Sequence, residues 1–218
     1  MSKIIKLSVA CLALAALTSA ANAATVGTYV GGGLGASVSS VKNDPFNITG
    51  ATSGTTSKSL GGLGGRVFAG YNFNRYFGLE AGYAKFARSL YQGTFNTSSS
   101  SLRYTTSALD VVGKGYLPLG DSGFNLFAGA GAALVNSKVK YSNNGVPLAS
   151  GFIAPNTGTT TTYRVRPTVA VGAGYDFNPQ WTTNLEYNFI AGQSNEKTNG
   201  KLVPSAGMLT LNLVYNLS

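Results

Sequence analysis

The feature that most constrains this chain is an alternation of apolar residues with small or polar ones. Between Leu63 and Phe73 the odd positions are Leu, Gly, Val, Ala, Tyr and Phe, whereas the even positions include Arg66 and Asn72. A period of two predicts a β-strand whose two faces meet different environments. The same period recurs along the chain after the first 23 residues, with no helical period, so an all-β protein is expected.

The first 23 residues have the pattern of a secretory signal peptide. Lys3 and Lys6 supply the positive start, residues 7–17 are an apolar core, and Ala21-Asn22-Ala23 is a small-residue cleavage site. This apolar core is too short to span a bilayer as a helix, which needs about 20 residues. We therefore expect an exported protein in which residues 24–218 form one domain.

The connections between the predicted strands alternate in length. Three are tight turns around Arg75, Asp121 and Pro179, and four are long and rich in Ser, Thr, Asn and Gly. Transmembrane barrels have short periplasmic turns and long external loops. The predicted strands are residues 25–39, 61–74, 77–86, 102–119, 124–135, 162–177, 181–190 and 207–218, and the predicted long loops are about 40–60, 87–101, 136–161 and 191–206.

Charged residues fall on one face of these strands, opposite an almost bare apolar face. In a membrane the apolar face meets lipid, where an Arg or Lys at the midplane costs about 2–4 kcal/mol. Only helices and closed barrels satisfy their backbone groups inside hydrocarbon. We therefore predict an eight-stranded antiparallel up-and-down transmembrane β-barrel. Its lumenal charges should pair with one another, because an unpaired buried charge is expensive; they are Arg66, Glu80, Asp110, Lys114, Arg164, Arg166 and Glu186.

A soluble, periplasmic, lipocalin-like barrel with the apolar face inward is the alternative. It would pack Trp181 and several tyrosines into a core interrupted by Gly65, Gly113 and Gly115. It also leaves the alternation of loop lengths without a cause. The membrane barrel instead predicts two aromatic girdles, one near the tight turns and one near the long loops.

The full chain has a net charge of +9, and without Lys3 and Lys6 of the predicted signal peptide the charge of residues 24–218 is +7. This excess lies on the predicted long loops and outer rim, where only Asp44 and Glu196 oppose the cations. Such a basic crown suits the phosphates of lipopolysaccharide, and a sharper hypothesis is adhesion to anionic host ligands such as sulphated glycans. We expect no nucleic-acid partner at an external site. The predicted contact residues are Lys42, Lys58, Lys85, Arg88, Arg103, Lys138, Lys140, Lys197 and Lys201.

The composition argues against catalysis. Histidine is absent, so a Ser-His or Asp-His base cannot be built. Ser194-Asn195-Glu196-Lys197 fits the S-x-x-K pattern of serine acylases, but neither accompanying motif is present, and chance is the better account. No cluster of metal ligands stands out. We expect a protein without catalytic activity, metal or cofactor.

Several segments resemble the OmpA-like, opacity-type outer-membrane β-barrels. They are Tyr29–Gly35, Gly70–Tyr83, Asp110–Leu119 and Leu209–Leu217, and the resemblance covers residues 24–218. It implies a small barrel in a Gram-negative outer membrane, often a surface antigen or adhesin, inserted by the outer-membrane assembly machinery. Members usually end in an aromatic residue, so the ending at Ser218 implies a weaker or shifted insertion signal. The peptidoglycan-binding domain of larger relatives is not expected here.

Two functions of different classes remain open. One is a structural and adhesin-like surface protein whose loops bind lipopolysaccharide or host ligands, and the other is a narrow or gated porin-like channel. An eight-stranded interior is just filled by its own side chains, so we expect Tyr29, Phe68 and Phe127 to occlude it. We also expect a monomer, and a bulge near Pro167, which removes one hydrogen bond from its strand.

Overall fold

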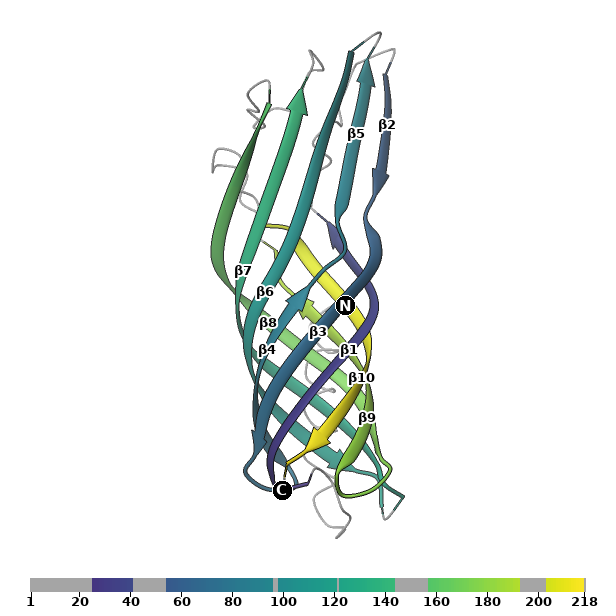
Figure 1. The fold of residues 1–218 in the computed structure, drawn as a ribbon, viewed down its shortest axis with the longest axis vertical. Helices are drawn as coiled ribbons and strands as arrows, with labels where there is room; N and C mark the ends of the chain where they lie inside the picture. The colour runs from purple at the N-terminus through teal and green to yellow at the C-terminus, as the bar shows by residue number, and fades with distance from the viewer. Residues whose placement is uncertain are drawn as a thin grey trace, which may run out of the picture.

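The computed structural model describes residues 25–40, 54–95, 98–120, 122–143, 157–192 and 203–217, so the predicted signal peptide lies outside the described residues. Within these ranges, no helix is long and apolar enough to cross a bilayer. Strands pair antiparallel around a closed ring in the order β1-β3-β4-β6-β7-β8-β9-β10, with β10 returning to β1 (Figure 1). The predicted all-β barrel is confirmed. Its strands are β1 (Gly27–Ser40), β3 (Gly61–Asn72), β4 (Phe77–Lys85), β6 (Ser98–Pro118), β7 (Phe124–Asn143), β8 (Thr157–Asp176), β9 (Trp181–Ile190) and β10 (Ser205–Asn216).

Tight turns close one end of the barrel. In the turn after β3, Asn74 Oδ1 accepts the backbone N–H groups of Tyr76 and Phe77 at 2.8 and 2.9 Å. Asn178 does the same for Gln180 and Trp181 in the turn after β8. These Asx turns explain why short Asn-rich connections suffice here. The start of β1 and the end of β10 lie at this same end (Figure 1), which is the periplasmic end of such a barrel.

The wall of the barrel is apolar outside and polar inside. Along β10, Leu209, Leu211 and Leu213 are exposed, whereas Thr210 and Asn212 are buried. Because the ring leaves no open edge, its outer wall can face hydrocarbon. The soluble barrel with its apolar face inward is therefore wrong.

Exposed aromatic side chains gather toward the two ends of the wall. Near the tight turns they contact one another in pairs: the rings of Trp181 and Tyr215 are 4.8 Å apart and those of Tyr71 and Phe73 5.5 Å. Toward the other end, Tyr83, Tyr163, Tyr187 and Phe189 are exposed. Aromatic residues at these two levels mark the membrane interfaces, so the strands between them cross the bilayer.

A sheet projects beyond the ring at the end opposite the tight turns (Figure 1). It contains two further strands, β2 (Gly54–Ser59) and β5 (Ser89–Phe95), which pair with each other. β5 also pairs with the outer part of β6, and the outer parts of β6, β7 and β8 pair in turn. We call β2, β5 and these outer parts the projecting sheet. The predicted bounds of three of the long loops are wrong here, since residues 54–59, 89–95, 98–101, 136–143 and 157–161 are strands.

An apolar cluster explains why these Ser- and Thr-rich segments are strands. Tyr91, Leu102, Tyr104 and Val139 are buried on one face of the projecting sheet, with Leu60 and Tyr141 packed against them. The rings of Tyr91 and Tyr104 meet edge to face at 5.7 Å between centroids. Each strand contributes only one or two of these residues, so the cluster is visible only once the strands are paired.

A β-bulge joins β4 to β5. Lys85 pairs with Ser107 and Ser89 with Tyr104, so the β4–β5 side has one residue more than β6. Phe86 and Ala87 both turn inward as a result and are buried.

The bulge predicted near Pro167 is absent. The register between β7 and β8 runs without an extra residue from Ser142 and Thr157 to Phe124 and Tyr175. Pro167 instead lies just before Thr168, where pairing with β9 begins. Its carbonyl oxygen accepts the Ala191 N–H at 3.1 Å on the β9 side. A proline is tolerated there because its missing N–H falls at the end of the β8–β9 ladder.

Candidate functional site

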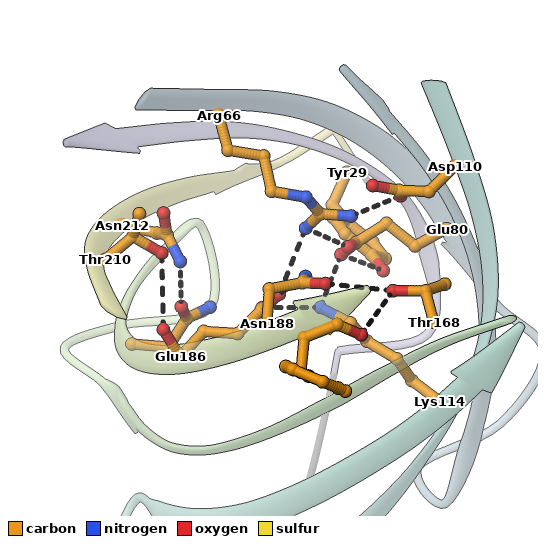
Figure 2. Close-up of polar contacts among 12 residues, drawn as sticks. Tyr29, Arg66, Glu80, Asp110, Lys114, Thr168, Glu186, Asn188, Thr210 and Asn212 are labelled. Carbon is orange, nitrogen blue, oxygen red and sulfur yellow. Dashed lines mark hydrogen bonds and ion pairs between the residues drawn. The ribbon is translucent and has the colours of Figure 1, made fainter. Parts of the chain in front are cut away.

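Five charged side chains meet in the lumen of the barrel (Figure 2). They come from four strands: Arg66 from β3, Glu80 from β4, Asp110 and Lys114 from β6, and Glu186 from β9. Each occupies an inward position of its strand and is almost completely buried. The alternation along each strand therefore points these five side chains into the lumen, and closure of the ring brings the side chains of the four strands into contact.

Two cations are shared among three carboxylates in this cluster, which we call the lumenal network. Arg66 Nη1 lies 2.6 Å from Glu80 Oε1 and 3.1 Å from Glu186 Oε1, while Arg66 Nη2 lies 2.6 Å from Asp110 Oδ1. Lys114 Nζ lies 2.8 Å from both Glu80 Oε2 and Glu186 Oε2. Glu80 and Glu186 each bridge the two cations, so the network is continuous across the lumen.

Neutral and aromatic groups complete the network. The Tyr29 hydroxyl donates to Glu80 Oε2 at 3.0 Å, and Asn188 Nδ2 donates to Glu186 Oε1 at 2.8 Å (Figure 2). Lys114 Nζ also lies over the rings of Phe68 and Phe127, 5.4 and 4.9 Å from their centroids. These contacts add stabilisation because cations are attracted to aromatic faces. Sequence reasoning did not identify Asn188, although its inward position two residues beyond Glu186 is a usable signal.

Glycines make room for the network. A Cβ atom added to Gly82 would lie 2.6 Å from Arg66 Nη2 and 2.9 Å from Cζ. One added to Gly70 would lie 2.4 Å from the Tyr29 hydroxyl, and one added to Gly172 would lie 2.4 Å from the Phe127 ring. Inward glycines thus sit against the large inward side chains of neighbouring strands, which a narrow barrel requires.

Arg164 and Arg166 do not join the network. Both lie on the inward face of β8, but beyond Thr168, where the pairing of β8 with β9 ends. Arg164 is exposed, and Arg166 donates to the carbonyl oxygens of Ala191 and Gly192, from Nε at 2.9 Å in the first case. The period of two gives the face of a residue but not its height in the barrel, which is why the sequence grouped them with the network.

The lumen changes character along its length. On the tight-turn side of the network it contains Asn72, Asn125, Asn184 and Asn216, all buried. On the opposite side it is filled by an apolar cluster that includes Phe86, Ile190 and Met208. The network and this cluster fill the middle of the lumen with buried side chains from several strands, and these contacts hold the strands of the ring together.

Basic residues lie on the outward face at the outer rim. Arg103 is directly opposite Lys140 on adjacent strands, and Lys138 is two residues along β7; all three are exposed. We call these three the basic sheet face. Lys85 and Arg88 are exposed nearby at the bulge. Of the other predicted contact residues, Lys58 is in β2 opposite Tyr91, and Lys42, Lys197 and Lys201 lie outside the described residues.

Carboxylates are kept away from the basic sheet face. In the described parts of the chain they are Glu80, Asp110, Asp176 and Glu186. Three belong to the lumenal network, and Asp176 accepts a hydrogen bond from Thr182 at 2.6 Å near the tight turns. The cations on the outer rim therefore face solvent without a described acidic neighbour.

Comparison with known proteins agrees with this geometry. The family model for the outer membrane protein beta-barrel domain matches residues 7–216. An uncharacterized protein of Coxiella burnetii is 28% identical over 219 residues, which cover 89% of this chain and 86% of that protein. Outer membrane protein A of Serratia marcescens is 29% identical over 155 residues, which cover 70% of this chain but only 39% of that longer protein.

The fold is also seen in a solved structure. The crystal structure of the outer membrane protein OprG from Pseudomonas aeruginosa has a TM-score of 0.52 to this chain at 12% identity, covering 90% of this chain and 100% of that one. At that identity the likeness concerns the fold alone. With the matched family model and the lipid-facing wall, it places the chain in the outer membrane of a Gram-negative bacterium. The chain belongs to the outer membrane protein beta-barrel domain family.

Proposed function

We propose that this protein is a monomeric surface protein without catalytic activity, whose basic sheet face binds clustered phosphate or sulfate groups outside the membrane. One observation carries the proposal: Arg103 and Lys140 are directly opposite on neighbouring strands, with Lys138 beside them. Like charges opposite one another in a sheet are destabilising. A polyanion bound across the three cations removes that repulsion.

Two sources supply such groups at this height. One is the phosphorylated core of neighbouring lipopolysaccharide, and the other is a sulphated glycan on a host surface. Both fit a rigid platform of exposed cations, because multiple charge contacts accumulate across a surface without a closed pocket. The projecting sheet supplies the rigidity, since the buried cluster around Tyr91 and Tyr104 holds its strands together.

Binding of defined polyanions tests the proposal. The protein in nanodiscs of neutral lipid is titrated with heparin and, separately, with lipopolysaccharide at physiological salt. Each cation near an anionic surface contributes about 1 kcal/mol of binding free energy. We therefore expect the double variant Arg103→Ser/Lys140→Ser to bind about thirtyfold more weakly. The control Arg75→Ser/Arg164→Ser removes the same charge elsewhere and should leave affinity nearly unchanged. Equal losses in both variants would show attraction by net charge alone and overturn the proposal.

A narrow or gated channel is a second candidate, favoured by the shared ion pairs of the lumenal network. Arg66 and Lys114 each contact more than one carboxylate, so exchange of partners is geometrically simple. The apolar cluster around Phe86 and Met208 opposes it, because hydrophobic constrictions exclude water and ions. Single-channel conductance is measured in a planar bilayer for the parent protein and for Arg66→Met. A conductance that changes in the variant would support the channel, and the absence of any conductance in the parent protein would eliminate it.

A further inference from the structure

A small cavity lies in the lumen between the lumenal network and the tight turns, and we call it the periplasmic vestibule. Its volume is about 40 Å³, measured where the centre of a water molecule fits, and each water needs about 10–15 Å³ on this measure. Sites for organic ligands are far larger, about 300–1,000 Å³. The vestibule therefore has room for a few waters or one small ion. Residues that line it are Asn125, Asp176, Thr182 and Asn216 toward the tight turns, and Glu80 and Lys114 toward the network.

A carboxamide on the wall of the vestibule is buried without a partner. Asn125 of β7 is opposite Gly174 of β8, and a Cβ atom at Gly174 would lie 2.7 Å from Asn125 Oδ1. The carboxamide therefore lies over this glycine. Asn125 is 4% exposed, and within the described ranges its carboxamide takes part in no hydrogen bond. A polar group so nearly buried is costly unless a partner satisfies it, so the vestibule suits a polar or charged ligand.

Oxygen atoms dominate the groups that are left for such a ligand. Asn216 Nδ2 donates to the Pro179 carbonyl at 3.1 Å, which leaves Asn216 Oδ1 as a free acceptor. Asp176 Oδ1 accepts the Thr182 hydroxyl at 2.6 Å, which leaves Asp176 Oδ2. With Asn125 Oδ1, three residues that line the vestibule each offer an oxygen. Carboxylate and carboxamide oxygens are the ligands that hard cations prefer.

The charge of the lumen also favours a cation. From the lumenal network to the tight turns, the described cations Arg66 and Lys114 face four carboxylates, which leaves a net charge of −2; the carboxylates are Glu80, Asp110, Asp176 and Glu186. Excess charge in a barrel interior is expensive without a counter-ion. The described residues contain no group of three or more His, Cys, Asp or Glu that could hold a metal ion. Because the number of charged ligands sets the affinity of oxygen sites, a single carboxylate outside the network suits a monovalent cation.

We infer that the periplasmic vestibule binds one alkali cation, Na⁺ or K⁺, between the Asp176 carboxylate and the carboxamides of Asn125 and Asn216. The cation enters from the periplasm, because Asp176 and Thr182 are half-buried at the tight-turn end. Lys114 repels it from the inner end of the vestibule and so keeps it near Asp176. The site uses no residue of the basic sheet face, so it goes beyond the proposed function.

Two variants change the vestibule in different ways. Asp176→Asn removes the charge and keeps the shape, whereas Asn125→Leu replaces the carboxamide with an apolar side chain. Gln92→Lys is the matched control for net charge, since it also adds one positive charge, on the exposed face of β5. Asn136→Leu is the control for the second variant, since Asn136 is on the outward face of β7.

Sodium-23 NMR measures the binding. The protein and its variants are purified in a neutral maltoside detergent and checked for folding by their gel mobility before and after heating. The linewidth of the Na⁺ signal is then recorded in NaCl solution, with empty detergent as the blank. KCl and tetramethylammonium chloride serve as competitors, because K⁺ can be coordinated by oxygens in a small cavity and the larger tetramethylammonium ion cannot.

The expected result is a Na⁺ signal that the parent protein broadens beyond the blank, and that K⁺ but not tetramethylammonium restores. Even an outer-shell partner is worth about 10–100-fold in metal affinity, so Asp176→Asn and Asn125→Leu should each weaken binding at least about tenfold. Both controls should bind Na⁺ as the parent does, and heparin binding by the vestibule variants should not change. No broadening beyond the blank, unchanged binding in both vestibule variants, an equal loss in Gln92→Lys, or displacement by tetramethylammonium would overturn the inference.

Discussion

Arg66 shows how much of this protein depends on single side chains in the lumen. Its guanidinium contacts Glu80, Asp110 and Glu186 and is fully buried. Removing one partner of a buried ion pair costs about 3–5 kcal/mol, because the remaining charge stays uncompensated. The side chain also needs space, and the space is provided by the absence of a side chain at Gly82. Charge and volume are therefore matched between neighbouring strands.

Gly82→Ala tests that match. The added Cβ atom would lie within 2.6 Å of Arg66 Nη2, so the guanidinium must leave its carboxylates or the strands must separate. Overpacking of this kind costs about 1–3 kcal/mol, and we expect that loss in the free energy of unfolding by urea in lipid vesicles. Gly113→Ala is the control, since its Cβ atom has no neighbour closer than 3.9 Å. Equal stability of the two variants would contradict the account.

At the level of elements, the projecting sheet carries the proposed binding surface beyond the membrane-spanning ring. Its strands are continuous with those of the barrel, but its stability comes from its own apolar cluster. The basic sheet face lies on the opposite side of the same strands, because Arg103 and Lys140 alternate with the buried Leu102, Tyr104 and Val139. A change inside the cluster should therefore affect the basic sheet face and spare the ring.

Tyr104→Ala tests this independence. Tyr104 is 2% exposed and packs on Tyr91, and deletion of a large buried side chain costs about 3–5 kcal/mol. We expect faster amide hydrogen exchange in β5 and the outer parts of β6 and β7, with unchanged exchange in β9 and β10. Gln92→Ala, on the exposed face of β5, should change neither. Faster exchange throughout the barrel would show that the two parts unfold together.

The whole molecule is built for lipid outside and polar contacts inside. Leu211 illustrates this: it lies midway along β10, between Leu34 and Leu185, and 63% of it is exposed. In water such a wall would favour aggregation, whereas in a bilayer it is the side that hydrocarbon solvates. The apolar wall requires the closed ring, because the backbone N–H and C=O groups of an open sheet edge would have no hydrogen-bond partners in the hydrocarbon.

Leu211→Arg tests the membrane position of the wall. A charge at the bilayer midplane costs about 2–4 kcal/mol, and one near an interface about 0–1 kcal/mol. We expect the larger loss for Leu211→Arg and the smaller for Leu119→Arg, because Leu119 follows the last residue of β6 at the tight turns. The free energy of unfolding from lipid vesicles measures both. A cost that does not depend on position would refute this placement of the barrel.

By itself the sequence determined the solvent of each face and the class of fold. Alternation, tight turns and the position of charges such as Arg66 and Glu80 are local properties that can be read along the chain. In a membrane, strands with this alternation must turn their apolar face to lipid and their charged face to the lumen of a closed barrel. Only the tertiary structure decided which inward charges meet, since height depends on strand tilt and register; Arg164 and Arg166 share a face with Thr168 but lie above the network. The projecting sheet was likewise decided by pairing, because Tyr91, Leu102 and Val139 become a core only when three separate strands place them side by side.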